Sequence, residues 1–290
     1  MRTSSRLALA VFAGLAVTAA FYKLPEIAAG GLLWPSRRTD IAPLPDGCRE
    51  RTWHGAGVEL QGWGCDARGS RRGTIIYLHG VADNRSSSAG VIRRYVSRGF
   101  DVLAYDSRRH GASTGEVCTY GFYEKQDLRA VVDSASTGPV VLIGTSLGAA
   151  VALQAAADDP RISRVVAAEI FSDLETVARE RAPFLLPSWV VRKAFDLAEQ
   201  RGSFKVADVS PVLAARRVAV PVLLIHGAAD RETPPAHSER VLAALAGPKR
   251  LLLVEGAGHN QSLNESSTWT AIDEWVLVDG DRLSLPSRSR

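Results

Sequence analysis

The chain has 290 residues, of which 46% are hydrophobic and 23% charged, so it suits one large domain better than two small ones. Its 35 Lys and Arg residues against 31 Asp and Glu residues give a formal net charge of +4. The basic residues are scattered and form no stripe interleaved with aromatic residues, which excludes the usual nucleic-acid surface, and we expect no nucleic-acid partner.

The first segment, residues 1–36, has the pattern of a targeting or anchoring sequence. Arg2 and Arg6 precede an apolar run from residue 7 to about residue 22, as in a secretory signal peptide, and residues 17–19 form a small-residue cleavage motif. The run is also close to the shortest length that spans a membrane, so an uncleaved single-pass anchor fits equally. In both interpretations the rest of the chain lies outside the cytoplasm. A helix buried within the domain is the alternative.

Two of the three cysteines are placed to pair. Residues 48–54 and 58–65 are predicted to form two short strands around a glycine turn. Folding the chain at Ala56 or Gly57 brings Cys48 opposite Cys65, so we expect a cross-strand disulfide, which requires an oxidising compartment. Two free buried thiols are the alternative. The third cysteine, Cys118, has no motif around it.

After a linker at residues 36–45, apolar β-rich runs alternate with helical patterns. This alternation predicts an α/β fold with a doubly wound, mostly parallel sheet. Strands are expected at residues 74–78, 101–105, 140–143, 164–170, 220–225 and 250–254. Helices are expected at residues 86–97, 124–134, 147–157, 238–246 and 267–278.

The segment at about residues 172–218 is long for a simple crossover between two strands, and we interpret it as a small helical cap of two or three short helices. The domain is then expected to span residues 46–280, with a C-terminal tail at 281–290. Seven apolar residues of the cap segment either line an apolar acyl pocket or only pack the cap onto the sheet. They are Phe184, Leu185, Leu186, Trp189, Val190, Val191 and Phe195.

Three polar residues each follow a predicted strand. Ser146 lies in Gly144-Thr145-Ser146-Leu147-Gly148, a G-x-S-x-G motif that opens a helix. Asp230 and His259 follow the strands expected at 220–225 and 250–254. Because reactive groups of such sheets lie at the carboxyl ends of the strands, we expect the three side chains to meet there. Their order along the chain is that of a nucleophile, acid and base triad, in which Ser146 attacks, His259 takes its proton and Asp230 orients the histidine.

These motifs resemble the α/β-hydrolase superfamily, in particular exported or membrane-anchored bacterial hydrolases related to serine aminopeptidases and ABHD-type proteins. The similarity covers residues 48–278. It also rests on residues 78–81, Leu-His-Gly-Val, which match the oxyanion loop of the family. A further match is residues 105–115, which resemble the family's D-x-R-x-x-G-x-S-x-G stretch and which we interpret as a structural loop. Ser107 and Arg108 occupy positions at which that stretch departs in detail from the usual pattern.

The resemblance implies an oxyanion hole formed by the backbone N–H groups of Val81 and Leu147, with His79 supporting the loop. Some relatives place the acid after the preceding strand, where Asp173 is the competitor of Asp230. The other histidines (His54, His110, His226 and His237) are interpreted as ordinary core or surface residues.

The expected function is therefore hydrolysis of an acyl bond in a small-molecule substrate, with a carboxylic ester as the first choice. An aminopeptidase or thioesterase with the same triad is an alternative, and so is a non-catalytic envelope protein that uses the fold for binding. The sequence lacks zinc-protease, Walker and dinucleotide motifs, and we expect no cofactor and no metal. Membrane association is expected through residues 1–36 if they remain uncleaved.

Overall fold

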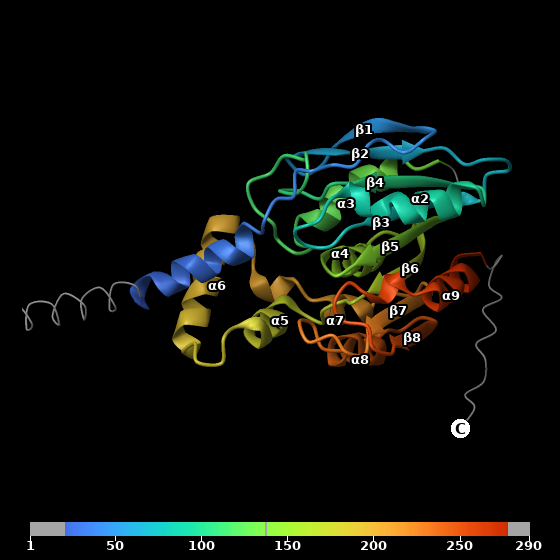
Figure 1. The fold of residues 1–290 in the computed structure, drawn as a ribbon. Coiled ribbons are helices and arrows are strands. Elements are labelled where there is room, and N and C mark those ends of the chain that lie inside the picture. The colour runs from blue at the N-terminus through green and yellow to red at the C-terminus, as the bar shows by residue number, and fades with distance from the viewer. Residues whose placement is uncertain (1–20, 137, 278–290) are drawn as a thin grey trace, which may run out of the picture.

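The structure is a computed structural model that describes residues 21–136 and 138–277, and Figure 1 shows its arrangement around one sheet. The part of the chain that it describes contains an eight-stranded sheet of order β1-β2-β4-β3-β5-β6-β7-β8. The strands are β1 (Cys48–His54), β2 (Glu59–Cys65), β3 (Gly73–Leu78), β4 (Phe100–Tyr105), β5 (Val140–Thr145), β6 (Ile162–Ala168), β7 (Val222–Gly227) and β8 (Lys249–Val254).

Strands β3 to β8 pair in parallel, whereas the β1–β2 hairpin is antiparallel and joins the sheet through β4. Strands β3, β4, β5 and β7 are buried along their whole length, as expected for parallel strands covered on both faces. The predicted mostly parallel, doubly wound sheet is confirmed. Strand β6 ends two residues earlier than predicted, because Glu169 adopts a positive φ of 49° and turns the chain out of the strand.

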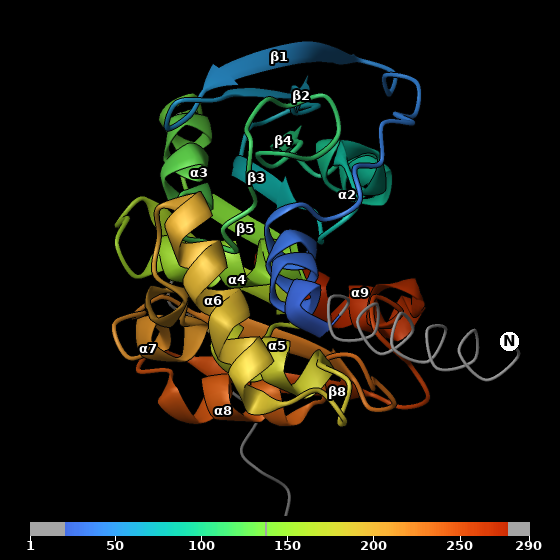
Figure 2. The same ribbon diagram turned by 90° about the vertical axis from the view of Figure 1, so that its left-hand side faces the viewer.

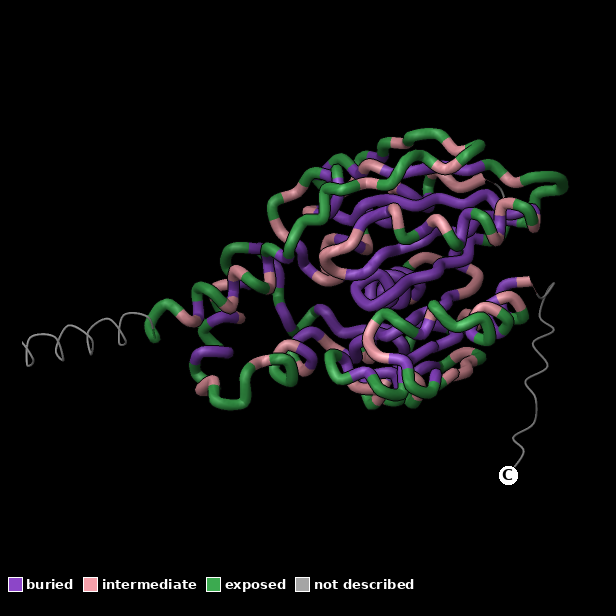
Figure 3. Tube along the Cα trace, in the orientation of Figure 1, coloured by how far each residue is buried: buried purple, intermediate pink, exposed green. Residues whose placement is uncertain are grey.

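Helices cover both faces of the sheet (Figures 1 and 3). The helices α2 (Ala89–Val96) and α9 (Ser266–Leu277) share one core cluster with one face of the strands. A second cluster, on the other face, includes residues of several helices that pack on the sheet. Among them are α3 (Glu124–Asp133), α4 (Leu147–Ala156), α7 (Pro211–Ala215) and α8 (Ala236–Ala244). Every residue of α4 is buried, so this helix is fixed against the centre of the sheet.

The insertion between β6 and β7 is helical, as the cap interpretation expects, and α5 and α6 project from one end of the sheet in Figure 1. It contains α5 (Leu174–Arg181), α6 (Ser188–Gly202) and the 3-10 turn η2 (Val206–Asp208). Helix α6 has 15 residues and is longer than the short helices that we expected. Val190 and Val191 are buried in the packing of α6, whereas Phe184 and Leu185 are 93% and 78% exposed.

Upstream of the sheet, residues 21–33 form a helix that packs beside α6 (Figure 2). Ala29 and Leu33 are fully buried in the same core cluster as the sheet, so the packed unit extends further upstream than residue 46. The following residues are also held: Arg37 donates to the Gly111 carbonyl at 2.8 Å, and Asn84 donates to two carbonyls of the segment expected to be a linker.

Most of the predicted signal or anchor, including its cleavage motif and residues 7–20 of its apolar run, lies outside the described residues, as do residues 278–290 with the C-terminal tail. Within residues 21–136 and 138–277, no helix is both long enough and apolar enough to span a membrane.

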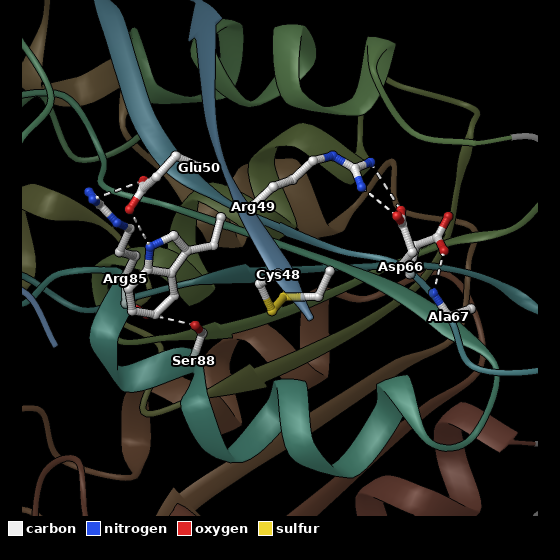
Figure 4. The surroundings of a disulfide bond; sticks show 10 residues. Cys48, Arg49, Glu50, Asp66, Ala67, Arg85 and Ser88 are labelled. Atoms are coloured by element: carbon white, nitrogen blue, oxygen red, sulfur yellow. Dashed lines mark hydrogen bonds and ion pairs between the residues drawn. A yellow bond between two sulfur atoms is a disulfide. The ribbon is translucent and has the colours of Figure 1, made fainter. Parts of the chain in front are cut away.

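The expected disulfide joins Cys48 to Cys65 across the β1–β2 hairpin, where the two residues are direct register partners (Figure 4). Beside it, Arg49 pairs with Asp66, and Glu50 accepts a hydrogen bond from Arg85 at 3.3 Å. Cys118 is a buried free thiol. The disulfide therefore fixes the open end of a hairpin that forms one edge of the sheet.

Candidate active site

Ser146 stands in a tight turn between β5 and α4. Its φ of 50° and ψ of −111° lie outside the regions that most residues occupy. The Ser146 amide donates to the Ala168 carbonyl of the neighbouring strand at 2.8 Å, and the Ser146 carbonyl accepts from the Ala150 amide at 3.1 Å. Strand, helix and neighbouring strand together hold the serine in this strained conformation at the carboxyl edge of the sheet.

The two glycines of the motif allow this turn because other backbone atoms occupy the space of a side chain. A Cβ atom on Gly148 would lie 2.1 Å from the Leu78 carbonyl oxygen of β3. A Cβ atom on Gly144 would lie 2.4 Å from the Gly148 carbonyl oxygen. Only glycine permits such close packing of the helix on the strands.

The structure brings Ser146, His259 and Asp230 together in a continuous chain of hydrogen bonds. His259 Nε2 lies 3.1 Å from Ser146 Oγ, and His259 Nδ1 lies 2.7 Å from Asp230 Oδ2. Since a carboxylate accepts only, Nδ1 carries the proton and Nε2 is free to accept from the serine hydroxyl. Each residue follows a different strand, respectively β5, β8 and β7.

Asp230 is held as an ionised carboxylate by several donors. Its Oδ1 accepts from the Glu232 and Thr233 amides, both at 2.9 Å, while His226 Nε2 lies 3.4 Å from Oδ2. Burial alone would raise the pKa of Asp230, but hydrogen bonds from His226, His259 and Thr233 outweigh it and hold the pKa well below its usual range. The group therefore keeps its negative charge opposite His259 throughout the neutral range.

The loop after β3 lies beside the serine, where the oxyanion loop was expected. A Cβ atom on Gly80 would lie 3.6 Å from Ser146 Cβ. His79 is fully buried, with Nδ1 2.7 Å from the Gly80 carbonyl oxygen and Nε2 accepting from the Ser107 amide at 3.0 Å. The imidazole thus orients the peptide unit before Val81. Leu147, the other expected oxyanion residue, is the first residue of α4.

A cleft of about 570 Å³ borders this loop. Its lining includes Gly80, Val81, Thr145 and Asn260, together with Arg38, Asp83 and Trp269, whereas the three triad residues do not line it. Polar and aromatic side chains both line the space, which is of the size of a small-molecule site. Asn260, directly after His259, accepts from the Thr145 hydroxyl at 3.0 Å.

Glu169 is a buried residue near the site that the sequence reasoning missed. Its Oε1 accepts from the amide of Ser262 at 3.2 Å and from the Ser262 hydroxyl, while Oε2 is buried without a hydrogen-bond partner. Burial raises the pKa of Glu169, partly opposed by the bonds from Ser262. The contact ties the end of β6 to the loop that carries His259. The available signal was an acidic residue within the apolar run predicted to continue to residue 170.

Asp173, the competing acid, is the N-cap residue of α5 and does not bond to His259. Its Oδ1 caps helix α5 by accepting from the Thr176 amide at 2.8 Å, and its Oδ2 accepts from the Ser172 hydroxyl. His259 Nδ1 donates its hydrogen bond to Asp230 instead. His226 is a core residue, fully buried beside Asp230, with Nε2 2.7 Å from the Thr233 carbonyl oxygen; its position next to the acid was not anticipated from the sequence.

The stretch at residues 105–115 forms a structural loop, as interpreted from the sequence. Asp106 is fully buried and accepts from the Arg85 side chain at 2.5 Å and from the Ala112 amide at 2.8 Å. Arg108 forms a buried bidentate ion pair with Asp127 of α3, at 2.7 and 2.8 Å. In the described residues, no group of three or more His, Cys, Asp and Glu side chains is arranged to hold a metal ion.

Comparison with known proteins finds a family model and a sequence relative that each match about two thirds of the chain. A model described as "Alpha/beta hydrolase family" matches residues 75–274. An uncharacterised Bacillus subtilis protein, YqkD, is 34% identical over 203 residues, which cover 67% of this chain and 67% of YqkD.

Solved structures of hydrolases share the fold. The Pyrococcus furiosus esterase Pf2001 matches with a TM-score of 0.63 and 24% identity, over 83% of this chain and 95% of the esterase. The Pyrococcus horikoshii acylaminoacyl peptidase matches with a TM-score of 0.60 and 16% identity, over 81% of this chain and 42% of the peptidase. At these identities the likeness concerns the fold alone.

Proposed function

Because the chain belongs to the alpha/beta hydrolase family, we propose that it is a serine hydrolase that cleaves a carboxylic ester through an acyl-enzyme on Ser146. The observation that carries this proposal is the hydrogen-bond chain from Ser146 Oγ to His259 Nε2 and from His259 Nδ1 to Asp230. Such a chain activates a hydroxyl that is unreactive at its own pKa.

In the proposed reaction, the Ser146 oxygen attacks the ester carbonyl carbon while its proton passes to His259 Nε2. Asp230 stabilises the imidazolium that results. The tetrahedral intermediate then expels the alcohol, which takes the proton from His259, and leaves the acyl group bound to Ser146. A water molecule, deprotonated by His259, attacks the acyl-enzyme and releases the acid, and the proton returns to Ser146.

The negative charge on the carbonyl oxygen needs donors in both tetrahedral intermediates, and we assign this role to the N–H groups of Val81 and Leu147. The close approach of Gly80 to Ser146 supports the assignment, since it brings the loop next to the reacting oxygen. A preorganised donor of this kind contributes about 3–4 kcal/mol to transition-state stabilisation.

The first test assays the full-length protein on p-nitrophenyl esters from acetyl to dodecanoyl. Hydrolysis is expected, and Ser146→Ala should abolish it and also prevent labelling by a fluorophosphonate probe. Ser163→Ala is the matched control, because Ser163 lies in β6 with its hydroxyl bonded to the Val140 carbonyl, at the amino edge of the sheet. Folded wild-type protein that neither hydrolyses these esters nor reacts with the probe would argue for a binding protein instead.

The identity of the acid is tested by a pair of variants. Asp230→Asn should lower kcat by roughly 10⁴-fold, because an amide favours the wrong tautomer of the histidine. Asp173→Asn should leave kcat nearly unchanged, since Asp173 caps α5 and accepts from Ser172, and the hydrogen bond from His259 goes to Asp230. If the two effects are exchanged, the acid has been assigned to the wrong strand.

The same triad serves esters, thioesters and amides, so a panel of matched thioester and amide substrates distinguishes the alternatives. We propose an ester before an amide because an ester carbonyl is the more reactive towards acyl transfer. Preferential cleavage of aminoacyl amides would instead assign an aminopeptidase.

We also propose that the domain works outside the cytoplasm, where a disulfide persists. The Cys48–Cys65 bond and the basic and apolar pattern of residues 2–22 support this location. Fractionation of cells, with thiol alkylation before denaturation to show whether the two cysteines are paired, tests it directly.

A further inference from the structure

Exposed apolar side chains from two segments that are distant in the sequence lie on the cap and on the helix beside it. They come from the start of the helix at 21–33 and from the α5–α6 connection with the first turn of α6 (Figure 2). We call them the cap-tip surface. Its members and exposures are Phe21 (41%), Tyr22 (71%), Phe184 (93%), Leu185 (78%) and Trp189 (39%).

The two segments are in direct contact. The Phe21 and Trp189 rings lie 5.7 Å apart, although 168 positions separate them along the chain. A cleft of about 740 Å³ between this helix, α5 and α6 is lined by Tyr22 and Trp189 together with charged residues of both signs: Arg179, Arg192 and Lys193, and Glu26, Glu175, Asp196 and Glu199. Isolated exposed apolar residues are ordinary on a protein surface. Aromatic and aliphatic side chains grouped at one end of the molecule instead indicate a surface that contacts a membrane or another protein.

The sequence that leads into this surface indicates which of these it contacts. Residues 7–20 contain no charged residue, and the run ends at Phe21 and Tyr22, which are themselves members of the cap-tip surface. A chain segment of this composition favours hydrocarbon. Tyr and Trp prefer the boundary between hydrocarbon and water, where one end of the side chain is apolar and the other is wet.

We propose that the cap-tip surface inserts into the headgroup region of a lipid bilayer, next to the point where the N-terminal apolar run enters it. The cap thereby becomes a second membrane contact in addition to the N-terminal run. In this orientation the end of the sheet that carries Ser146 lies on the side of the domain that faces the lipid. Because this docking involves no chemistry at Ser146, the proposal stands or falls separately from the hydrolase activity.

The test uses full-length protein reconstituted with vesicles of phosphatidylcholine and phosphatidylglycerol. Leu185→Cys is labelled with the environment-sensitive fluorophore NBD, and Ser70→Cys is the matched control, because Ser70 is exposed in the connection that leads into the amino end of β3. The wild-type protein is the labelling blank, since Cys118 is buried and the other two cysteines form a disulfide.

We expect vesicles to shift the NBD emission at position 185 to the blue, and nitroxide-labelled lipids to quench it, with neither effect at position 70. Adding Phe184→Glu to the Leu185→Cys variant should abolish both effects, whereas Leu253→Glu, at an exposed leucine outside the cap-tip surface, should not. Emission at 185 that stays water-like with vesicles overturns the proposal. A blue shift that depends on protein concentration and needs no vesicles also overturns it, in favour of a second copy of the chain.

Discussion

At Gly148 the absence of a single methyl group decides whether α4 can pack against β3. Replacement by alanine forces a Cβ atom to within 2.1 Å of the Leu78 carbonyl oxygen, a backbone atom that cannot rotate away. We expect Gly148→Ala to lower the free energy of unfolding by about 1–3 kcal/mol. Urea denaturation followed by circular dichroism measures this.

The control for this substitution is Gly90→Ala in α2. Gly90 is exposed, and a Cβ atom there meets no atom within 4 Å. Alanine is expected to raise the free energy of unfolding by about 0.5–1 kcal/mol through its higher helix propensity. Equal losses in both variants would mean that the contact with Leu78 is not what requires glycine.

His110 should make the stability of the protein depend on pH. Burial, with His79 nearby, lowers its pKa from 6.5 to about 4. The unfolded chain therefore binds more protons between these two values, so stability is complete above about pH 6.5 and is lost as the pH falls towards 4. The loss from this one group is about 3 kcal/mol.

His110→Asn should flatten this part of the stability profile, because asparagine does not titrate. Denaturation at several pH values across the window measures the slope. His54→Asn, at an exposed histidine, should leave the slope unchanged. A slope that is the same in wild type and His110→Asn would assign the acid sensitivity to other groups.

The triad geometry could be anticipated from the sequence, because Ser146, Asp230 and His259 each follow a strand and parallel strands end at one edge. The residues that support it could not. Glu169 reaches Ser262 across 93 positions of the chain, and His226 meets Asp230 only because the β7 loop folds back. Such contacts depend on side-chain directions in the folded loops, which spacing along the sequence does not specify.

At the scale of elements, the disulfide determines how firmly the β1–β2 hairpin is held. The bond closes a separation of 17 residues at the edge of the sheet. Replacing both cysteines with alanine should lower the free energy of unfolding by about 3 kcal/mol, largely by releasing a constraint on the unfolded chain. Denaturation with and without reductant checks this, since reductant should weaken the wild type and leave the variant unaffected.

The hairpin itself was predicted with its pairing, because the glycine turn fixes the register locally. The sequence did not predict its place in the sheet, where β2 lies against β4 rather than β3. That choice depends on how the crossovers through α2 and α3 fold. The helix at 21–33 was not predicted, because the apolar run was expected to end at about residue 22. The alternative of a helix buried within the domain concerned that run itself.

At the scale of the whole molecule, the helix at 21–33 connects the cap to the rest of the domain. Leu33 is fully buried, lies beside Gly202 at the end of α6, and accepts from the Cys118 amide through its carbonyl at 2.9 Å. Leu33→Ala should therefore lower the free energy of unfolding by about 2–5 kcal/mol.

Limited proteolysis of the same variant should also cut α6 faster than in wild type, because the cap loses part of its support. Ile27→Ala is the control, since Ile27 is 66% exposed on the same helix and its truncation should change stability by less than about 0.5 kcal/mol. If Leu33→Ala behaves like Ile27→Ala, the helix is not a structural part of the domain.

The position of Leu33 also determines when its helix can pack while the chain is being synthesised. Its partners near Gly202 and Phe204 are made about 170 residues later, which at roughly 5–20 residues per second is a delay of about 10–30 s. During that interval the emerging chain carries a helix whose apolar face has no partner. Leu33 therefore packs against α6 only after α6 has left the ribosome, although it is among the early residues to be translated.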